Sequence, residues 1–394
     1  MNKTLKITLV SMLLAAGYTQ AEETETTLNA YAAGYTAGFT CSAVFNANKS
    51  MAQVREHELS GIYSLIAERV KGMTPEVDKE NNWVRVPYDD GRRERISVWR
   101  SKLGCVDLPV GASVDDAKFL ADPFRGDKAA DKDSGAPWGK RAEVNSTSDN
   151  AQLESVLKQA FTKKYGSGSR TSAVLIVTPD EIIAERYLEG FSPETAQRTW
   201  SVAKSIGASV IGAAIQQNKI ELDAPAGISN WSHPLDPRGH ITLENLLHMA
   251  SGLDSNNAGN RTDRVYMGGG LVSDTATETA LEVTPGSRWK YANNDTMLAL
   301  RALHERFDTT EEYLQFPYKA LLEKIGMQHT FVETDWRGDF ILSSQVWTTS
   351  RDLARLGVLH LQAGQWQGEQ ILPEGWLDYI SMPAPAQPPE DAPG

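Results

Sequence analysis

Ser201 and Lys204 are the residues of this 394-residue chain whose types and spacing are best suited to chemistry. Residues three apart on a helix lie one above the other, so the Lys204 ammonium can reach the Ser201 hydroxyl. A serine hydroxyl is a weak nucleophile until a neighbouring base takes its proton, and a desolvated lysine with a lowered pKa can help to do this. The pair therefore predicts nucleophilic catalysis by Ser201.

A second Ser-x-x-Lys pair, Ser155 and Lys158, shows that the motif alone is a weak signal. It lies inside a polar helix predicted for residues 150–164, away from the amino end. Ser201 instead opens residues 198–219, where apolar residues recur at a spacing of three and four. These residues are Val202, Ile206, Val210, Ile211, Ala214 and Ile215. We expect Ser201 in the first helical turn, where unpaired amides and the helix dipole favour negative charge on its Oγ and on an attacked carbonyl oxygen.

Tyr291 and Asn293 are the second pair of interest, at the start of a helix predicted to continue to about residue 307. A tyrosine beside an ammonium loses its proton more easily, so Tyr291 can carry protons to and from Ser201 if folding brings the two together. Asn293 offers an amide that can orient Lys204 or a substrate carbonyl. Asn293 or its neighbour can also cap the helix. By itself Tyr-x-Asn is a weak signal, because a buried tyrosine near a cap is commoner than a catalytic one.

The elements around these residues are predicted from apolar patterning. Two strands, 172–177 and 181–187, precede Ser201, and Thr242 is expected to cap a short helix that extends to residue 249. Residues 254–270 form a polar loop rich in Gly and Asn, which is either a substrate-facing loop or an ordinary surface excursion.

The first residues have the pattern of a secretory signal. Lys3 and Lys6 precede an apolar run at 7–16, and small residues form a cleavage site at the end of 1–21. The mature chain is then expected to begin near Glu22. Because the apolar run is too short to span a bilayer, we predict an exported protein, periplasmic or secreted, without a membrane span.

Residues 22–125 are predicted to form a small α+β unit, for which the sequence indicates no function. Helical spacing covers 30–45 and 51–69, and two alternating strands at 83–86 and 95–99 flank a turn at 89–91.

The chain has two cysteines, Cys41 and Cys105. An oxidising compartment favours a disulfide between them, and two free buried thiols are the alternative. The polar stretch 126–150 is predicted as a linker, and a second unit as residues 151–394.

Composition narrows the classes of partner. The net charge of −12 and the isoelectric point near 5.2 argue against nucleic acid or an anionic membrane. The seven histidines lack metal-ligand spacing such as HExxH, so no metal or other cofactor is expected. The chain also lacks a Gly-x-Ser-x-Gly elbow and a phosphate-binding glycine loop.

Three segments taken together resemble the serine β-lactamase and penicillin-binding-protein superfamily. They are Ser201-Val-Ala-Lys204, then LLHMASGL, then PGSRWKYANND about 90 residues after the serine. The chain looks most like the class C β-lactamase-like hydrolases, a group with the family VIII carboxylesterases and the nylon-oligomer hydrolases, over about residues 170–382. The resemblance implies an α/β (α+β) fold with a sheet flanked by helices. It also implies that Ser201 is acylated, Lys204 activates it, Tyr291 acts as general base and acid, and Asn293 supports them.

One motif of that family is missing. Its members carry a Lys or His, any residue and a Gly on a strand near the C-terminus, and this strand supplies part of the oxyanion hole. The only such triplet after Asn293 is 324–326, which we interpret as a chance match because Gly326 is typical of a helix stop. A two-stranded sheet at 172–187 is marginally stable by itself. We therefore hypothesise a C-terminally shortened chain, which three or more further strands on this hairpin would contradict.

These observations predict an exported serine hydrolase that cleaves a small ester or amide through an acyl-enzyme on Ser201. A β-lactamase or DD-peptidase acting on penicillins or peptidoglycan is one alternative. A non-catalytic envelope binding protein that keeps the fold is another. The sequence does not indicate an oligomeric state.

Overall fold

The computed structural model describes residues 24–127, 137–255 and 262–388 of the chain. The predicted signal segment, residues 1–21, lies outside these ranges. None of the described helices is both long and apolar enough to cross a membrane.

The N-terminal elements are a long buried helix and an antiparallel sheet. Helix α1 (Glu25–Phe45) carries no charge after Glu25, so most of its length can be buried, and the Thr24 side chain caps its amino end. It packs on a four-stranded sheet in the order β1-β2-β3-β4. The strands are β1 (Glu76–Asp78), β2 (Trp83–Tyr88), β3 (Arg93–Arg100) and β4 (Gly104–Asp107), and a 3-10 helix follows at Val114–Phe119.

Two sequence predictions for this unit have different outcomes. Cys41 and Cys105 form a disulfide that joins α1 to β4, as predicted. The single helix predicted for 51–69 is wrong, because the structure has α2 (Met51–His57) and α3 (Ser64–Gly72) instead. Gly61 lies between them with φ of +65°, a left-handed conformation that ends a helix.

A second region is built on the predicted hairpin. Strands β6 (Ala173–Val177) and β7 (Glu181–Tyr187) pair antiparallel, and α4 (Ala151–Ala160) accompanies them. The segment predicted as a linker contributes β5 (Lys140–Arg141), which pairs parallel with β7. Within the described residues the hairpin therefore gains one further strand.

The third region is mostly helical and contains α5 (Ala203–Gln216). The only charged residue of α5 is Lys204, which explains why this helix is buried along most of its length. The other helices of this region are α6 (Leu243–Leu247), α7 (Thr262–Tyr266), α8 (Val272–Thr275), α9 (Asn293–His304), α10 (Thr310–Pro317), α11 (Ser350–Leu361) and α12 (Trp376–Ser381). Short 3-10 turns lie at Trp200–Val202, Ser229–Trp231 and Pro237–His240, and a π-helical turn at Tyr318–Leu322.

A small antiparallel sheet lies beneath these helices in the order β8-β10-β9. Its strands are β8 (Gln197–Arg198), β9 (Thr330–Val332) and β10 (Val346–Thr348), and a separate hairpin is formed by β11 (Gln365–Trp366) and β12 (Glu369–Gln370). The result is a mixed α/β fold with sheets flanked by helices, as predicted.

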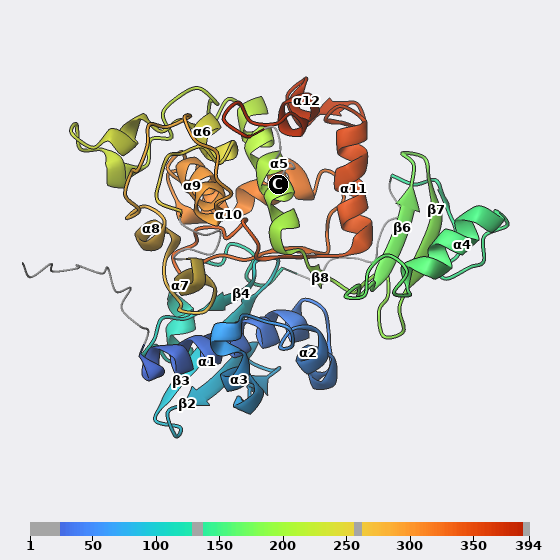
Figure 1. Cartoon of the computed structure of the whole chain (residues 1–394), viewed down its shortest axis with the longest axis horizontal. Helices are drawn as coiled ribbons and strands as arrows, with labels where there is room; N and C mark the ends of the chain where they lie inside the picture. The colour runs from blue at the N-terminus through green and yellow to red at the C-terminus, as the bar shows by residue number, and fades with distance from the viewer. Residues whose placement is uncertain (1–23, 128–136, 256–261, 389–394) are drawn as a thin grey trace, which may run out of the picture.

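The N-terminal elements lie against the helical region rather than apart from it. In Figure 1, α1, α2 and α3 lie below α5, α9 and α11, while β6, β7 and α4 project to the right. Buried residues of α1 and of α5 and α9 belong to one hydrophobic core. The predicted domain boundaries at 125 and 151 stay a prediction.

Candidate active site

The backbone that carries Ser201 runs from a strand directly into a helix. Arg198 pairs with Trp347 of β10, and the Thr199 amide donates to the Val346 carbonyl at 3.0 Å. The chain then turns sharply, and Trp200 adopts φ of +47°, which is rare for a residue with a side chain. Ser201 lies exposed in the 3-10 turn that opens the helical segment, directly ahead of α5.

The four predicted site residues lie within one hydrogen-bond network. Tyr291 donates its hydroxyl hydrogen to Ser201 Oγ at 2.6 Å, and Lys204 Nζ donates to the same oxygen at 3.2 Å. Lys204 also donates to Asn293 Oδ1 at 2.7 Å and to the Ser343 carbonyl at 2.8 Å. The serine oxygen therefore faces two groups that can exchange protons with it.

Burial tunes the charge of Lys204. Removal from water lowers the pKa of Lys204, while the hydrogen bond and the charge of Tyr291 oppose this shift. The ammonium lies 4.8 Å from the centroid of the Tyr291 ring. The three acceptors of the ammonium are the Ser201 hydroxyl, the Asn293 amide oxygen and the Ser343 carbonyl. All three are uncharged, so no carboxylate in the described network favours the protonated form.

Tyr291 and Asn293 are positioned by the packing of α9 on α5 and on α6. The Lys290 amide donates to the Met249 carbonyl at 2.9 Å, and Ser251 Oγ donates to Asp295 at 2.9 Å. The LLHMASGL segment thus fixes the turn before α9. Asn293 is the first residue of α9, Ala292 is its N-cap, and neither Asn293 nor its neighbour caps the helix as predicted.

One member of the network was not predicted. The Ser343 carbonyl belongs to the segment before β10, and the Ser343 hydroxyl forms a 2.7 Å hydrogen bond with Tyr266 at the end of α7. A backbone carbonyl leaves no signature in the sequence, so only the tertiary structure reveals it. Tyr266 is buried and falls inside the predicted loop 254–270. Through its hydrogen bond to Ser343, this part of the loop helps to hold the carbonyl that Lys204 contacts.

A buried cluster from the N-terminal elements holds the turn that precedes Ser201. The Arg198 guanidinium contacts two neighbouring rings, with its central carbon 4.2 Å from the Phe39 ring centroid and 4.1 Å from that of Trp200. Arg198 also approaches Glu58 at 3.4 Å, and Tyr63 of the loop before α3 meets the Trp200 ring edge-on. No sequence pattern predicted this contact, because Phe39 and Arg198 lie about 160 positions apart.

Two lookalike motifs lie outside this network. Ser155 accepts a hydrogen bond from Gln159 and Lys158 pairs with Glu154 at 3.3 Å, so the second Ser-x-x-Lys pair is not joined. Lys324 pairs with Glu369, and Gly326 has φ of +78°, as expected of a helix stop. Among the described residues, no group of three or more His, Cys, Asp or Glu side chains is arranged to hold a metal ion.

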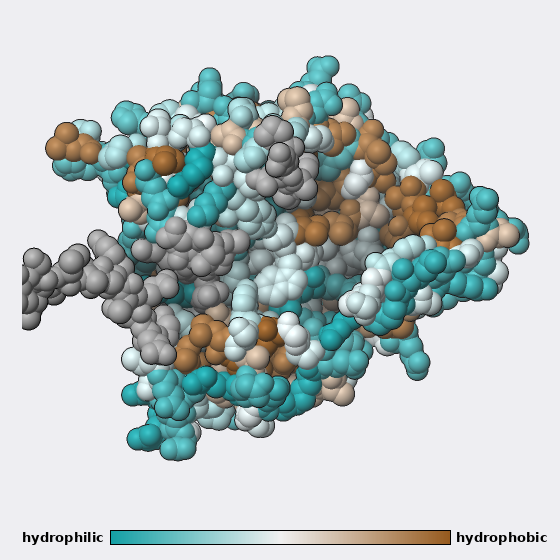
Figure 2. All heavy atoms as spheres, in the orientation of Figure 1, coloured by the Kyte–Doolittle hydropathy of each residue, from teal (hydrophilic) through white to brown (hydrophobic). Residues whose placement is uncertain are grey.

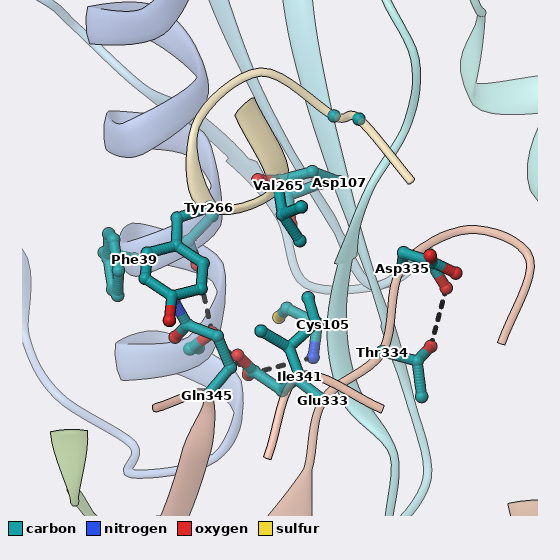
Figure 3. A pocket seen from close by; sticks show the side chains of 15 residues that line it. Phe39, Cys105, Asp107, Val265, Tyr266, Glu333, Thr334, Asp335, Ile341 and Gln345 are labelled. Atoms are coloured by element: carbon teal, nitrogen blue, oxygen red, sulfur yellow. Dashed lines mark hydrogen bonds between the residues drawn. The ribbon is translucent and has the colours of Figure 1, made fainter. Parts of the chain in front are cut away.

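A small buried cavity of about 30 Å³ lies between α1, β4 and the segment that follows β9. Figure 3 shows Glu333 pointing toward the Cys105 backbone. Glu333 Oε1 accepts hydrogen bonds from Ser42 Oγ at 2.6 Å, Asn46 Nδ2 at 3.1 Å and the Cys105 amide at 3.2 Å. Burial raises the pKa of Glu333 to about 8 and that of Asp107 to about 6.

The model of the family described as Beta-lactamase matches residues 157–387, which is more than half of the chain. The chain therefore belongs to the Beta-lactamase family. Among curated proteins it is similar to the 6-aminohexanoate-dimer hydrolase of Paenarthrobacter ureafaciens, with 28% identity over 229 residues. That match covers 53% of this chain and 57% of the relative, so the chain spans little more than half the relative's length.

Solved structures with a similar arrangement include the octameric penicillin-binding protein homologue from Pyrococcus abyssi. It is 18% identical with a TM-score of 0.46, and the match covers 60% of both chains. FmtA from Staphylococcus aureus is 13% identical with a TM-score of 0.47, over 68% of this chain and 76% of that one.

Proposed function

We propose that this protein is a serine hydrolase that cleaves an ester or amide through an acyl-enzyme on Ser201. The observation that carries the proposal is the exposed Ser201 hydroxyl, which takes hydrogen bonds from both Tyr291 and Lys204. A nucleophile within hydrogen-bond reach of a base that is itself oriented by a third group is the arrangement that covalent catalysis requires. Membership of the Beta-lactamase family supports the same reaction class.

In the proposed mechanism the Tyr291–Lys204 pair must first have lost one proton. The Lys204 ammonium stabilises the resulting Tyr291 phenolate. Ser201 Oγ then attacks the substrate carbonyl carbon and passes its proton to this phenolate. Collapse of the tetrahedral intermediate expels the leaving group, which takes that proton from Tyr291. In the second half of the reaction, water attacks the acyl-enzyme and gives a proton to Tyr291. Tyr291 then returns a proton to Ser201 Oγ as the acid product leaves. Asn293 and the Ser343 carbonyl orient Lys204 throughout.

The backbone amide of Ser201 is the proposed donor to the oxyanion. It belongs to the first turn at the amino end of the helical segment, where amides lack intrahelical acceptors and the helix dipole favours negative charge. An oxyanion donor contributes about 10² to 10³ in rate.

The substrate is proposed to be a small amide or ester. An amide is supported by the curated relative, which is a 6-aminohexanoate-dimer hydrolase. A β-lactam or a peptidoglycan peptide is the second candidate, supported by the family description.

We also propose that the protein is exported. The Cys41–Cys105 disulfide supports this, because disulfides persist in oxidising compartments. Fractionation of cells that express the full chain tests it, since the proposal requires the protein outside the cytoplasm.

The function is tested by intact-protein mass spectrometry after reaction with a fluorophosphonate, a penicillin and a p-nitrophenyl ester. One adduct per chain on Ser201 is expected, and the reagent whose adduct disappears with time identifies the substrate class. Ser201→Ala is expected to abolish labelling, whereas Ser155→Ala in the lookalike pair leaves it unchanged.

Circular dichroism checks that both variants are folded. A folded wild-type protein that takes no adduct from any reagent would reject the serine hydrolase and favour a non-catalytic binding protein. Labelling that persists in Ser201→Ala would place the nucleophile elsewhere.

A further inference from the structure

The proposed site is open on one side and packed on the other. Beside the turn that carries Ser201 the surface is hollowed between the N-terminal elements and the β6–β7 hairpin, as Figure 2 shows, and Trp200 is part of the wall of this cleft. On the packed side lies the first turn of α9, where Asn294 and Asp295 are at most 4% exposed. Side chains of this buried turn can therefore hold Tyr291, which precedes it, in place.

Asp295 is the third residue of α9 and lies four residues after Tyr291. Its carboxyl group accepts two hydrogen bonds from a single residue, Ser251. Ser251 Oγ donates to Oδ1 at 2.9 Å, and the Ser251 amide donates to Oδ2 at 3.4 Å. Ser251 Oγ also accepts a hydrogen bond from the Leu253 amide at 3.2 Å. The contact thus fixes residues 251–253 against the first turn of α9.

The turn that Ser251 belongs to contacts the residue next to Tyr291. Met249, two residues before Ser251, adopts φ of +51°, a left-handed conformation that is rare for a residue with a side chain. Such a residue costs on the order of 1 to 3 kcal/mol and persists only where its surroundings hold it. The Met249 carbonyl accepts a hydrogen bond from the Lys290 amide at 2.9 Å. The position of Tyr291 therefore depends on a turn that Asp295 holds in place.

The charge state of Asp295 affects how firmly it holds this turn. Burial raises the pKa of Asp295 to about 7, while the hydrogen bonds from Ser251 and the charge of Arg288 oppose the shift. Arg288, the charged side chain that faces Asp295, pairs with Glu282 at 2.7 Å. The ionised carboxyl accepts both hydrogen bonds from Ser251. A proton on one of its oxygens would replace an acceptor by a donor and weaken the contact.

We infer that Asp295 is a positioning residue of the proposed hydrolase. Through Ser251 it holds the turn that places Tyr291 within reach of Ser201. The inference rests on the proposed function of these two residues. Because Asp295 acts through the turn and not on the reacting atoms, its loss should slow proton transfer and leave substrate binding almost unchanged.

Asp295→Asn is the first test, because the amide has nearly the same size but presents a donor to Ser251. Since a displacement of about 1 Å costs on the order of 10²-fold, acylation of Ser201 by p-nitrophenyl acetate is expected to be about ten- to a hundredfold slower with little change in KM. Rates are normalised to the fraction of Ser201 that fluorophosphonate labels at completion. Asp274→Asn, at an exposed aspartate in the first turn of α8, is the matched control and should react as wild type.

A double-mutant cycle separates positioning from general stability. In the Tyr291→Phe background, Asp295→Asn should slow acylation by less than about twofold, because no Tyr291 hydroxyl remains to be positioned. Equal slowing in both backgrounds would overturn the inference, since a purely structural role does not depend on that hydroxyl. If Asp295→Asn does not fold, Ser251→Ala removes the same contact from its other side and gives the same comparison.

The pH profile provides a second readout. The ratio of wild-type to Asp295→Asn acylation rates should fall toward one as the pH decreases below about 7, because the wild-type carboxyl then carries a proton. Ionisation of the Tyr291–Lys204 pair affects both proteins and cancels in this ratio. A ratio that stays constant between about pH 5.5 and about pH 8.5 would contradict the inference.

Failure of the proposed function is recognised separately. In that case fluorophosphonate does not label Ser201 in wild type, and the role inferred for Asp295 is rejected with it. Labelling of wild type together with equal acylation rates in wild type and Asp295→Asn would reject the positioning role alone.

Discussion

Tyr291 and Lys204 both reach the Ser201 oxygen, but they differ in what they can do there. The Tyr291 hydroxyl is the shorter contact, at 2.6 Å, and it can pass a proton on to a leaving group. Lys204 is more deeply held, because Asn293 and the Ser343 carbonyl fix its ammonium. At the scale of single residues, we therefore propose Tyr291 as the proton carrier and Lys204 as the cation that orients and stabilises it.

Tyr291→Phe removes the proton carrier and leaves the ring under the Lys204 ammonium. Because general acid–base catalysis contributes about 10² to 10⁴ in rate, acylation of Ser201 by a p-nitrophenyl ester is expected to fall by about that factor. Stopped-flow release of p-nitrophenol measures it. Tyr165→Phe, at an exposed tyrosine that contacts Gln159, is the control and should react normally. Full activity of Tyr291→Phe would assign the proton transfer to Lys204 alone.

At the scale of elements, α1 and the loop before α3 contact Arg198 and Trp200 in the turn that carries Ser201. Trp200 has φ of +47°, and such a residue costs on the order of 1 to 3 kcal/mol unless its surroundings hold it. The Arg198 guanidinium, which contacts the Phe39 and Trp200 rings and pairs with Glu58, supplies that support. The N-terminal elements therefore have a role in the site although they contribute no residue to the Ser201 network.

Phe39→Leu is expected to loosen this stack and misplace Ser201. Because a displacement of about 1 Å costs on the order of 10²-fold, we expect kcat to fall about ten- to a hundredfold while KM changes little. Initial rates, normalised to the fraction of Ser201 that fluorophosphonate labels, measure this.

Phe45→Leu is the matched control on the same helix, because Phe45 stacks on Trp99 and does not contact Trp200. It should lower the melting temperature without changing kcat. An equal loss of kcat in both variants would mean that Phe39 contributes only to stability.

At the scale of the whole molecule, buried carboxyl groups join the N-terminal elements to the rest of the chain. Glu333 accepts hydrogen bonds from Ser42 and Asn46 at the end of α1, across almost 300 residues of sequence. Burial raises the pKa of Glu333 from its ordinary value of 4.5 to about 8. Burial also raises the pKa of Asp107 to about 6 and that of Asp335 to about 7, the latter with help from the nearby charge of Asp339.

These shifts predict that stability falls as the pH rises. A carboxyl whose pKa is higher in the folded than in the unfolded state favours folding fully below its unfolded pKa, and this contribution is lost as the pH approaches the folded pKa. For Glu333 the window runs from about pH 4.5 to about pH 8. Since one unit corresponds to about 1.4 kcal/mol, the free energy of unfolding should decrease by a few kcal/mol across it.

Glu333→Gln tests the assignment, because the amide cannot ionise. Differential scanning calorimetry should show a smaller decrease in melting temperature between about pH 7 and about pH 8 for the variant than for wild type, because Glu333, with a pKa of about 8, keeps more of its proton there than Asp107 or Asp335. Glu143→Gln, at an exposed glutamate, should behave as wild type. A wild-type melting temperature that does not change over this range would contradict the prediction.

The sequence by itself determined most local elements and pointed to the residues of the proposed site. The patterned helix after Ser201, the hairpin at 173–187 and the Thr242 cap follow from spacing and turn chemistry, which act over a few residues. The Cys41–Cys105 disulfide could be predicted because the chain has only two cysteines. The break between α2 and α3 was missed, because Gly61 is one residue within an otherwise helical pattern.

The tertiary structure alone decided which distant residues meet. The pairing of Tyr291 with Ser201 across 90 residues was expected only from the resemblance, and local spacing carried no such information. The Ser343 carbonyl, the Arg198 stack on Phe39 and the buried Glu333 were not predicted at all. These three contacts depend on the position of a backbone atom or on the burial of a charged side chain. Position and burial are both set by how the whole chain packs.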